Sequence, residues 1–302
     1  MGSGRFRSMG VGELLDGVFS LYRRNFVLIA AISAIVQVPY AVILFVLYQL
    51  SGFSALQNQL GASQGRTITP QQAQDVLGSF GTILLVTSLL ALVQVFVVQP
   101  LAVAATTRAV SDRYLDRPAT IRDSYASALR RLGSLIVQSL ILIFGSAVVL
   151  VAAVFLIALL AAGIGSSAIP IAILLVLGLI VLFAIVFVRT SLAVPAIVLE
   201  RLSGWGGLAR SWNLVRDLFW RMLGIRLLLA LITGIISGVI GVILSLAGTP
   251  LDVNGRFIVQ QVATDFATVF VSPVTYIAVT LLYYDARIRK EAFDIEMLAQ
   301  SL

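Results

Sequence analysis

Long apolar runs alternate with short polar segments along this chain. Six runs are long enough to cross a bilayer, because a hydrocarbon core about 30 Å thick needs about 20 helical residues. The runs cover residues 26–50, 78–105, 134–162, 169–199, 223–247 and 262–284. Unbroken apolar runs of this length exclude barrel strands, which alternate and span about 9–11 residues. The pattern predicts an all-α polytopic membrane protein with six transmembrane helices in a single domain, residues 1–302.

Three of the predicted spans follow a segment with an amphipathic pattern. DGVFSLYRRNFVLI begins at Asp16, and DSYASALRRLGSLI begins at Asp123, with Asp, Ser and paired arginines at identical spacing. A looser relative, RSWNLVRDLFWRMLGI, begins at Arg210. An apolar face with arginines nearby is typical of helices in the membrane interface. We interpret the chain as three repeats, each an amphipathic helix followed by a helical hairpin, and the segments as juxtamembrane anchors or as a docking platform.

The basic residues predict the orientation of these spans. All but Arg66 and Arg256 of the 21 lysines and arginines flank the spans on one side. The positive-inside rule makes this side cytoplasmic, so both termini are predicted to be cytoplasmic. Arginine far outnumbers lysine, which favours a GC-rich bacterial genome and therefore the bacterial plasma membrane. The net charge of +7 then reflects loops that face anionic headgroups rather than nucleic acid.

The composition excludes most familiar enzyme chemistry. Of the 302 residues, 59% are hydrophobic and 12% are charged, which is more apolar surface than one soluble core can bury. The chain has no cysteine and no histidine, so it lacks thiolate nucleophiles, the common zinc ligands and a histidine general base. The sequence contains no glycine-rich phosphate loop, serine elbow or zinc motif. We therefore expect a non-enzymatic protein without a cofactor.

Nine arginines near the span ends are our candidate contacts for anionic lipid or for a membrane or cytoplasmic partner protein. They are Arg23, Arg24, Arg130, Arg131, Arg189, Arg210, Arg226, Arg287 and Arg289. Arg189 interrupts the fourth apolar run, and a charge at the membrane centre costs about 2.5–3.5 kcal/mol. In one interpretation the helix ends near Arg189, which snorkels to phosphate level, and Pro195 breaks off an interfacial piece. In the other interpretation Arg189 faces the bundle interior with a partner. Arg226 poses the same question.

Prolines and amides also lie within the predicted spans. Pro100, Pro195 and Pro273 fall inside the three even-numbered spans, and broken helices can line a transport site. The alternative function is therefore a transporter or lipid-translocating protein, which predicts a hydrated cavity bounded by these prolines. Gly234 and Gly238 are expected to allow close helix packing. Four amides are expected to hydrogen-bond between helices: Gln37, Gln94, Gln99 and Gln138.

The chain finishes with LLYYDARIRKEAFDIE, residues 281–296. Tyr283 and Tyr284 are expected at the headgroup boundary, where aromatic side chains gather. Beyond them, charges four residues apart can pair along a helix that leaves the membrane. The predicted pairs are Asp285 with Arg289, Arg287 with Glu291, and Lys290 with Asp294. This segment is predicted to be a cytoplasmic exit helix whose charges form its solvated face.

Four blocks of the sequence together resemble a known family. They are VGELLDGVFSLYRRNF at 11–26, VPAIVLE at 194–200, RSWNLVRDLFWRMLG at 210–224 and YYDARIRKEAFDIE at 283–296. The chain resembles the bacterial glycerophosphoryl diester phosphodiesterase membrane-domain family, in which some members fuse a similar membrane region to a soluble phosphodiesterase. This chain lacks that catalytic domain. The resemblance therefore implies a membrane protein of unestablished role and assigns no functional residues.

Overall fold

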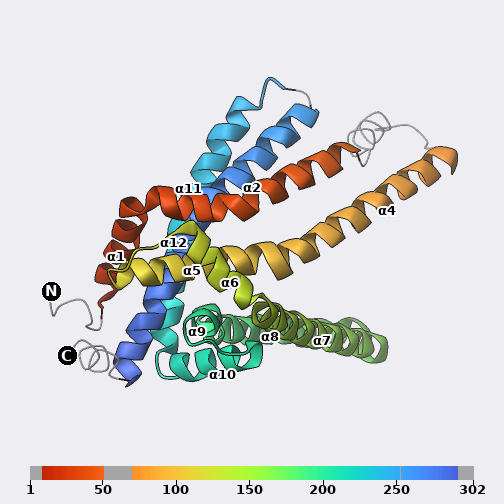
Figure 1. Ribbon diagram of the computed structural model, residues 1–302. Helices are drawn as coiled ribbons and strands as arrows, with labels where there is room; N and C mark the ends of the chain where they lie inside the picture. Colours follow the sequence, from red (N-terminus) through yellow and green to blue (C-terminus); the bar gives the residue numbers. More distant parts are fainter. Residues whose placement is uncertain (1–8, 51–69, 252, 292–302) are drawn as a thin grey trace.

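The computed structural model describes residues 9–50, 70–251 and 253–291, and these residues form helices without any strand. Six helical stretches are long and apolar enough to cross a membrane, as the sequence predicts. They are arranged as three hairpins that spread apart from a shared base (Figure 1). Both ends of the described chain lie near this base, which fits an even number of spans.

Within the described residues, the first unit contains four α-helices and a short π-helical segment. They are α1 (Val11–Arg24), α2 (Phe26–Leu50), α4 (Pro70–Val93), the π-helical η1 (Gln94–Val98) and α5 (Gln99–Tyr114). The second unit consists of α6 (Ile121–Arg130), α7 (Leu132–Ile164), the 3-10 turn η2 (Gly165–Ala168), α8 (Ile169–Arg189) and α9 (Ala193–Leu199). The third unit consists of α10 (Gly204–Val215), α11 (Phe219–Ala247) and α12 (Val253–Glu291).

The predicted repeat is present in this order of elements. A short helix, α1, α6 or α10, precedes each hairpin. The sequence sets the start of each short helix through its cap. The Glu13 side chain accepts the Gly10 N–H at the start of α1 (2.8 Å), and Thr120 and Ser203 accept N–H groups at the starts of α6 and α10. Each cap satisfies a donor that the first helical turn leaves unpaired.

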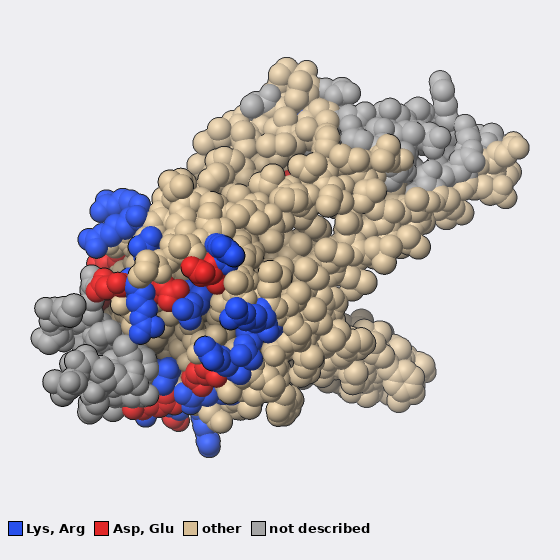
Figure 2. All heavy atoms as spheres, in the orientation of Figure 1, with Lys and Arg blue, Asp and Glu red and all other residues tan. Residues whose placement is uncertain are grey.

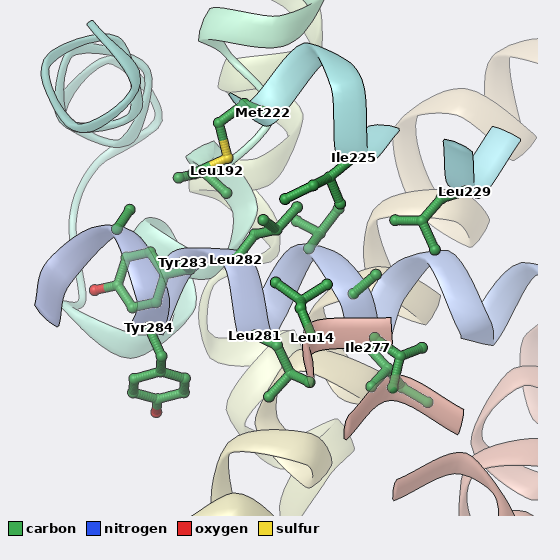
Figure 3. Close-up of a cluster of buried hydrophobic side chains, with 14 of the residues drawn as sticks. Leu14, Leu192, Met222, Ile225, Leu229, Ile277, Leu281, Leu282, Tyr283 and Tyr284 are labelled. Atoms are coloured by element: carbon green, nitrogen blue, oxygen red, sulfur yellow. The ribbon is translucent and has the colours of Figure 1, made fainter. Parts of the chain in front are cut away.

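The central helix of the bundle is α12. In its most apolar stretch 72% of the residues are buried, whereas the corresponding share is 0% for α7 and 6% for the span that contains α8. Helices that are apolar all round and exposed are solvated by lipid. Figure 3 shows part of the core that forms around the end of α12, with labelled residues from α1, α11 and α12 and with Leu192 from the turn between α8 and α9. Tyr283 and Tyr284 lie within this core and are almost fully buried, so their rings pack against protein rather than lipid. Their depth at the headgroup boundary stays a prediction.

The charged residues gather at the base of the three hairpins (Figure 2). We call this region the basic end, formed by α1, α6, α9, α10 and the last turns of α12. The opposite end carries the turns of the hairpins, including η2 and residues 248–251. This separation of charge is the one that the distribution of basic residues predicts.

The fourth predicted span, residues 169–199, is two helices rather than one. The helix α8 ends at Arg189, a turn follows over Thr190–Leu192, and α9 runs from Ala193 to Leu199. Pro195 lies in the first turn of α9, where the backbone N–H has no intrahelical partner to lose. Pro195 therefore does not interrupt a span. The helix α9 is not an interfacial piece either, since most of its residues are buried in the core.

The other two prolines are accommodated within long helices. In the second span η1 closes with a hydrogen bond from the Gln99 N–H to the Gln94 carbonyl, five residues back. This wider turn comes directly before Pro100, which cannot donate to the α-helical ladder. Pro273 lies inside α12 and is buried among the helices that surround it. Neighbouring helices let a membrane helix tolerate such an interior proline.

Candidate binding surfaces at the basic end and between α11 and α12

A buried carboxylate, Asp285, ties the start of the chain to the third unit. Its side chain is 0% exposed. Arg221 of α11 donates to it from Nε (3.3 Å) and Nη2 (3.1 Å), and Arg289 donates from Nε (3.0 Å). The Met9 N–H also donates to Asp285 (2.9 Å), and both guanidinium groups donate to the Met9 carbonyl. The charge of Asp285 is therefore compensated on several sides, as a buried charge requires.

A second ionic cluster surrounds Glu200, which follows α9. Arg210 of α10 donates from Nε to both oxygens of Glu200 (3.0 and 2.9 Å), and the Tyr283 hydroxyl donates to Oε1. The same Arg210 donates to Glu291 at the end of α12 (Nη2 to Oε2, 2.7 Å), and Arg287 also donates to Glu291 (3.1 Å). This cluster joins the second unit to the third through one guanidinium that serves two carboxylates.

A third contact joins the end of α12 to the turn before α11. Lys290 Nζ lies 2.5 Å from Asp217 Oδ2 and donates to the Asn213 carbonyl (2.7 Å). Lys290 therefore reaches a partner in the third unit, and its predicted partner Asp294 lies outside the described residues. The three ionic contacts bind the last turns of α12 to every unit of the bundle. We refer to them together as the α12 clamp, centred on Asp285, Glu200 and Lys290.

The predicted pairing along α12 is confirmed for the two pairs that fall within the described residues. Asp285 pairs with Arg289 (3.0 Å), and Arg287 pairs with Glu291 (3.1 Å). The prediction that these charges form a solvated face was wrong for Asp285, which is fully buried, whereas Arg289, Lys290 and Glu291 are exposed. Helical spacing brings the charges together, and the packing of α12 against its neighbours removes Asp285 from solvent.

The pKa values of three groups on or beside the short helices are shifted by their surroundings. The Lys290 ammonium donates a hydrogen bond to Asp217, and this bond holds the pKa of that carboxyl below its usual value. The hydrogen bond from Arg210 to Glu291 raises the pKa of Arg210, which fixes its positive charge. On α6, burial raises the pKa of Tyr125 to about 12. Each group therefore keeps one protonation state near neutral pH.

Four of the nine candidate arginines, at the basic end, have no carboxylate partner among the described residues. Arg23 and Arg24 end α1, and Arg130 ends α6; all three are exposed. Arg131 occupies the turn before α7 and donates to the Arg201 carbonyl (3.2 Å). In the part of the chain that the structure describes, none of the four pairs with a carboxylate. Three other candidates, Arg210, Arg287 and Arg289, belong to the α12 clamp.

The last two candidates, Arg189 and Arg226, lie against aromatic rings. The Arg189 guanidinium carbon lies 4.6 Å from the centre of the Trp212 ring, and that of Arg226 lies 4.2 Å from the centre of the Phe187 ring. Such cation–π contacts partly compensate a charge that has left water. Among the described residues neither arginine pairs with a carboxylate. Arg189 ends α8, which confirms that the helix stops at this residue. Snorkelling of Arg189 and Arg226 to phosphate level stays a prediction.

A cleft of about 520 Å³ separates α11 from α12 in the half of these helices away from the basic end. On α11 it is lined by Thr233, Gly234, Ser237 and Gly241. No atom comes within 4 Å of a Cβ placed on Gly234, Gly238 or Gly241, so the prediction that this stripe packs helices closely was wrong. The glycines instead leave space beside α12.

Polar side chains recur every four residues along the α12 side of this cleft. They are Gln260, Thr264, Thr268, Ser272 and Tyr276. Residues spaced by four lie near one face of a helix, so together they form a polar stripe over about 24 Å of its length. Most of the side chains that line the cleft are thus polar, although α11 and α12 are both long and apolar enough to cross a membrane.

The polar stripe continues toward the basic end as direct contacts with α5. Tyr276 hydrogen-bonds Gln99, the Thr280 hydroxyl lies 3.4 Å from that of Thr107, and the Tyr284 hydroxyl lies 2.6 Å from that of Ser111. Thr107, Thr280, Ser111 and Tyr284 are all buried. Beyond the cleft, toward the basic end, α12 is therefore packed against α5 through buried polar contacts, which we call the polar floor.

A second, smaller cleft of about 300 Å³ lies between α5 and α7. Gln94, Gln99, Pro100 and Gln138 line it. The Gln94 side chain donates a hydrogen bond to the Gln37 side chain of α2 (3.3 Å), which confirms the predicted hydrogen bonding between helices for these two amides. Neither of these two clefts is bounded by all three of Pro100, Pro195 and Pro273, and only Pro100 lines one of them, so neither is the cavity that the transport alternative predicts.

Sequence reasoning missed two parts of these surfaces. Arg221 was counted among the basic residues but not selected, and Asp285 was assigned a solvated pair. A usable signal does exist in the sequence. Asp112 and Asp285 are 173 residues apart, the same separation as Pro100 and Pro273. This relation marks both aspartates as equivalent positions at the basic end, and both are buried.

Residues 9–286 match the family described as a domain of unknown function, DUF7847, and the chain belongs to that family. The match extends over all three units, from two residues before α1 into the last turns of α12. It does not include the glycerophosphoryl diester phosphodiesterase membrane-domain family that the sequence blocks resemble. No curated protein and no solved structure matches the chain.

Proposed function

We propose that this is a non-enzymatic protein of the bacterial plasma membrane that binds anionic lipid headgroups at its basic end, on the cytoplasmic side. The single observation that carries the proposal is the exposure of Arg23, Arg24 and Arg130 at the ends of α1 and α6, with Arg131 beside them. Each pair of arginines comes directly before a transmembrane helix. This is the depth at which lipid phosphates lie.

The surroundings of these arginines support a lipid ligand. Phe26 and Val27 are exposed next to Arg24, and Leu129 is exposed next to Arg130. Exposed apolar side chains beside arginines suit the boundary between headgroups and acyl chains. The internally paired arginines differ, because the carboxylates of the α12 clamp already compensate their charges. The structure thus separates the basic residues that hold the fold from those with charge left for a ligand.

A partner protein docked on the same basic end is the alternative occupant. The exposed rings of Trp205 and Trp220 on α10 and α11 offer it apolar contacts. These tryptophans also suit the headgroup level, where they support the lipid interpretation equally. The resemblance to the phosphodiesterase membrane-domain family supports a membrane region that works beside another protein, and we propose that relationship as a distant one.

A second candidate function is translocation of a lipid or solute. The observation that favours it is the polar cleft between α11 and α12. A polar cleft at membrane depth is typical of transport proteins, in which sites lie between spans. The packed floor between α5 and α12 would have to open for passage toward the basic end.

The lipid proposal is tested with the full chain in nanodiscs. A variant with Arg23, Arg24, Arg130 and Arg131 changed to Gln is compared with one in which the same four become Lys. Each base near an anionic surface contributes about 1 kcal/mol, so the Gln variant should lose about 100- to 1000-fold in affinity for phosphatidylglycerol. The Lys variant keeps the charge and should retain most of that affinity. Equal phosphatidylglycerol binding by both variants would exclude the proposal.

Capture of proteins by crosslinking in native membranes tests the alternative occupant. If the Gln variant keeps its phosphatidylglycerol but loses a crosslinked protein, the basic end serves a partner rather than lipid. The thermal unfolding midpoint of each variant provides the control for folding. The four arginines make no ion pair within the described residues, so their replacement should leave the midpoint almost unchanged.

A further inference from the structure

We propose that the cleft between α11 and α12 binds an uncharged, hydroxyl-rich group. The cleft has a volume of about 520 Å³, which is within the range of small-molecule binding sites. It lies on the far side of the polar floor from the arginines of the basic end, so it is a separate site. The proposal therefore does not depend on the binding of anionic lipid.

The hydroxyl groups of the cleft are arranged as hydrogen-bond acceptors. Thr233 donates to the Leu229 carbonyl (2.7 Å), and Thr264 and Thr268 donate to carbonyls one turn earlier in α12 (3.0 and 2.9 Å). A threonine hydroxyl has one proton and two lone pairs, so each of these oxygens keeps acceptor capacity after that donation. A ligand that supplies several O–H donors would match this lining.

The amides and the phenol of the cleft add groups that can both donate and accept. Gln260 lines the end nearer the turns of the hairpins, while Gln99 and Tyr276 line the end at the polar floor. Hydroxyl groups of a ligand also donate and accept, so they can satisfy both kinds of partner. An apolar ligand would leave the remaining donor and acceptor capacity of these groups unused and is disfavoured.

The charge of the ligand follows from the same lining. No Asp, Glu, Lys or Arg side chain lines the cleft within the described residues. A charged ligand group at membrane depth without an opposite charge costs several kcal/mol. The ligand group is therefore uncharged. Two sources supply such chemistry: a free polyol or sugar, and the headgroup of an uncharged glycolipid whose acyl chains remain in the bilayer.

Access to the cleft is limited toward the basic end. There α12 packs against α5 through the buried pairs Thr107–Thr280 and Ser111–Tyr284, and α11 packs against α12 in the apolar core that contains Ile225 and Leu229. A ligand must therefore enter from the end that carries the turns of the hairpins, or sideways between α11 and α12. Sideways entry suits a lipid headgroup, whereas entry from the end suits a free polyol.

The test fills the cleft and compares the result with a matched substitution outside it. Gly234→Leu places a side chain in the cleft, and Gly238→Leu places the same side chain one turn further along α11, where it does not line the cleft. Both positions have open space at Cβ, so both variants should fold. The full chain in phosphatidylcholine nanodiscs is titrated with monoglucosyl diacylglycerol, diacylglycerol and glucose, and binding is measured from the thermal unfolding midpoint.

We expect monoglucosyl diacylglycerol, glucose or both to raise the midpoint of the native chain and of Gly238→Leu, and to have no effect on Gly234→Leu. A response to glucose alone identifies a free polyol as the source, and a response to the glycolipid alone identifies a lipid headgroup. Thr268→Val keeps the side-chain shape but removes a hydroxyl, and it should weaken binding about tenfold. An equal response to diacylglycerol, an equal response of both leucine variants, or no response to any probe would overturn the proposal.

Discussion

The hydroxyl oxygens of Ser111 and Tyr284 lie 2.6 Å apart, although the two residues are separated by 173 positions in the chain. Thr107 and Thr280 are also in contact (3.4 Å), with the same separation. Two contacts with one constant separation require α5 and α12 to run parallel and in register. The last helices of the first and third units thus face each other at equivalent positions, as expected of repeated units that pack around a shared axis.

The first prediction concerns the energy of the Ser111–Tyr284 contact. Both residues are buried, so Ser111→Ala and Tyr284→Phe should each lower the free energy of unfolding by about 1–3 kcal/mol, because each leaves a partner hydroxyl short of a hydrogen bond. The double variant should lose less than the sum, with a coupling energy of about 0.5–3 kcal/mol. Unfolding in mixed micelles measures all four proteins. If the double variant loses the sum of the two single losses in unfolding free energy, the two hydroxyl groups do not interact energetically.

The second prediction concerns the close approach of α10 to α7. A Cβ on Gly204 would lie 2.5 Å from the Ser134 carbonyl oxygen and 2.8 Å from the Gln138 amide nitrogen. Both are backbone atoms, so the helices must move apart, and Gly204→Ala should cost about 1–3 kcal/mol of unfolding free energy. Gly145→Ala on α7 is the control, because nothing lies within 4 Å of its Cβ. That variant should be neutral or slightly stabilising, since Ala favours helix over Gly.

The sequence predicts the number and order of the transmembrane spans because both depend on local patterns. Runs of about 20 apolar residues identify all six spans, and the recurring Asp and Arg spacing identifies α1 and α6 before their hairpins. The end of α8 at Arg189 is readable for the same reason, since one charge interrupts an apolar run. The burial of α9 is not readable, because a short apolar helix has the same pattern in the core and at the interface.

The candidate sites depend on contacts between distant segments, which a single sequence does not show. Asp285 has its predicted partner Arg289 one turn away, but its burial depends on Arg221 and Met9, which come from other parts of the chain. The cleft was missed for a related reason. Thr264 and Thr268 donate to carbonyls of their own helix, and they can do so whether they pack against a neighbour or line a cavity.

The third prediction concerns the orientation in the membrane. The chain has no cysteine, so a single introduced thiol reports its own location. Arg117 lies at the basic end between α5 and α6, and Thr249 lies in the turn after α11; both are exposed. In intact bacterial cells a membrane-impermeant maleimide should label Thr249→Cys and should label Arg117→Cys only after permeabilisation. The reverse pattern would place the basic end outside and contradict the positive-inside rule for this chain.

The fourth prediction compares two carboxylates of the α12 clamp that differ in burial. Asp285 is 0% exposed and compensates Arg221, whereas the side chain of Asp217 is 69% exposed where it pairs with Lys290. Asp285→Asn leaves Arg221 without its carboxylate in a partly buried position, so we expect a loss of about 3–5 kcal/mol in the free energy of unfolding. Asp217→Asn removes an equal charge from solvent and should leave the unfolding midpoint unchanged within error.

The double variant Arg221→Met with Asp285→Asn separates the loss of the ion pair from the cost of a stranded charge. If the stranded guanidinium causes most of the loss, removal of both charges should recover a large part of the stability that Asp285→Asn loses. Met9 should then be less well ordered, since its carbonyl loses the bond from Arg221 and keeps only that from Arg289, and its N–H meets a neutral amide oxygen in place of a carboxylate. Hydrogen exchange at the start of α1 measures that change. Full stability with unchanged protection in Asp285→Asn would show that the clamp does not hold the first unit to the third.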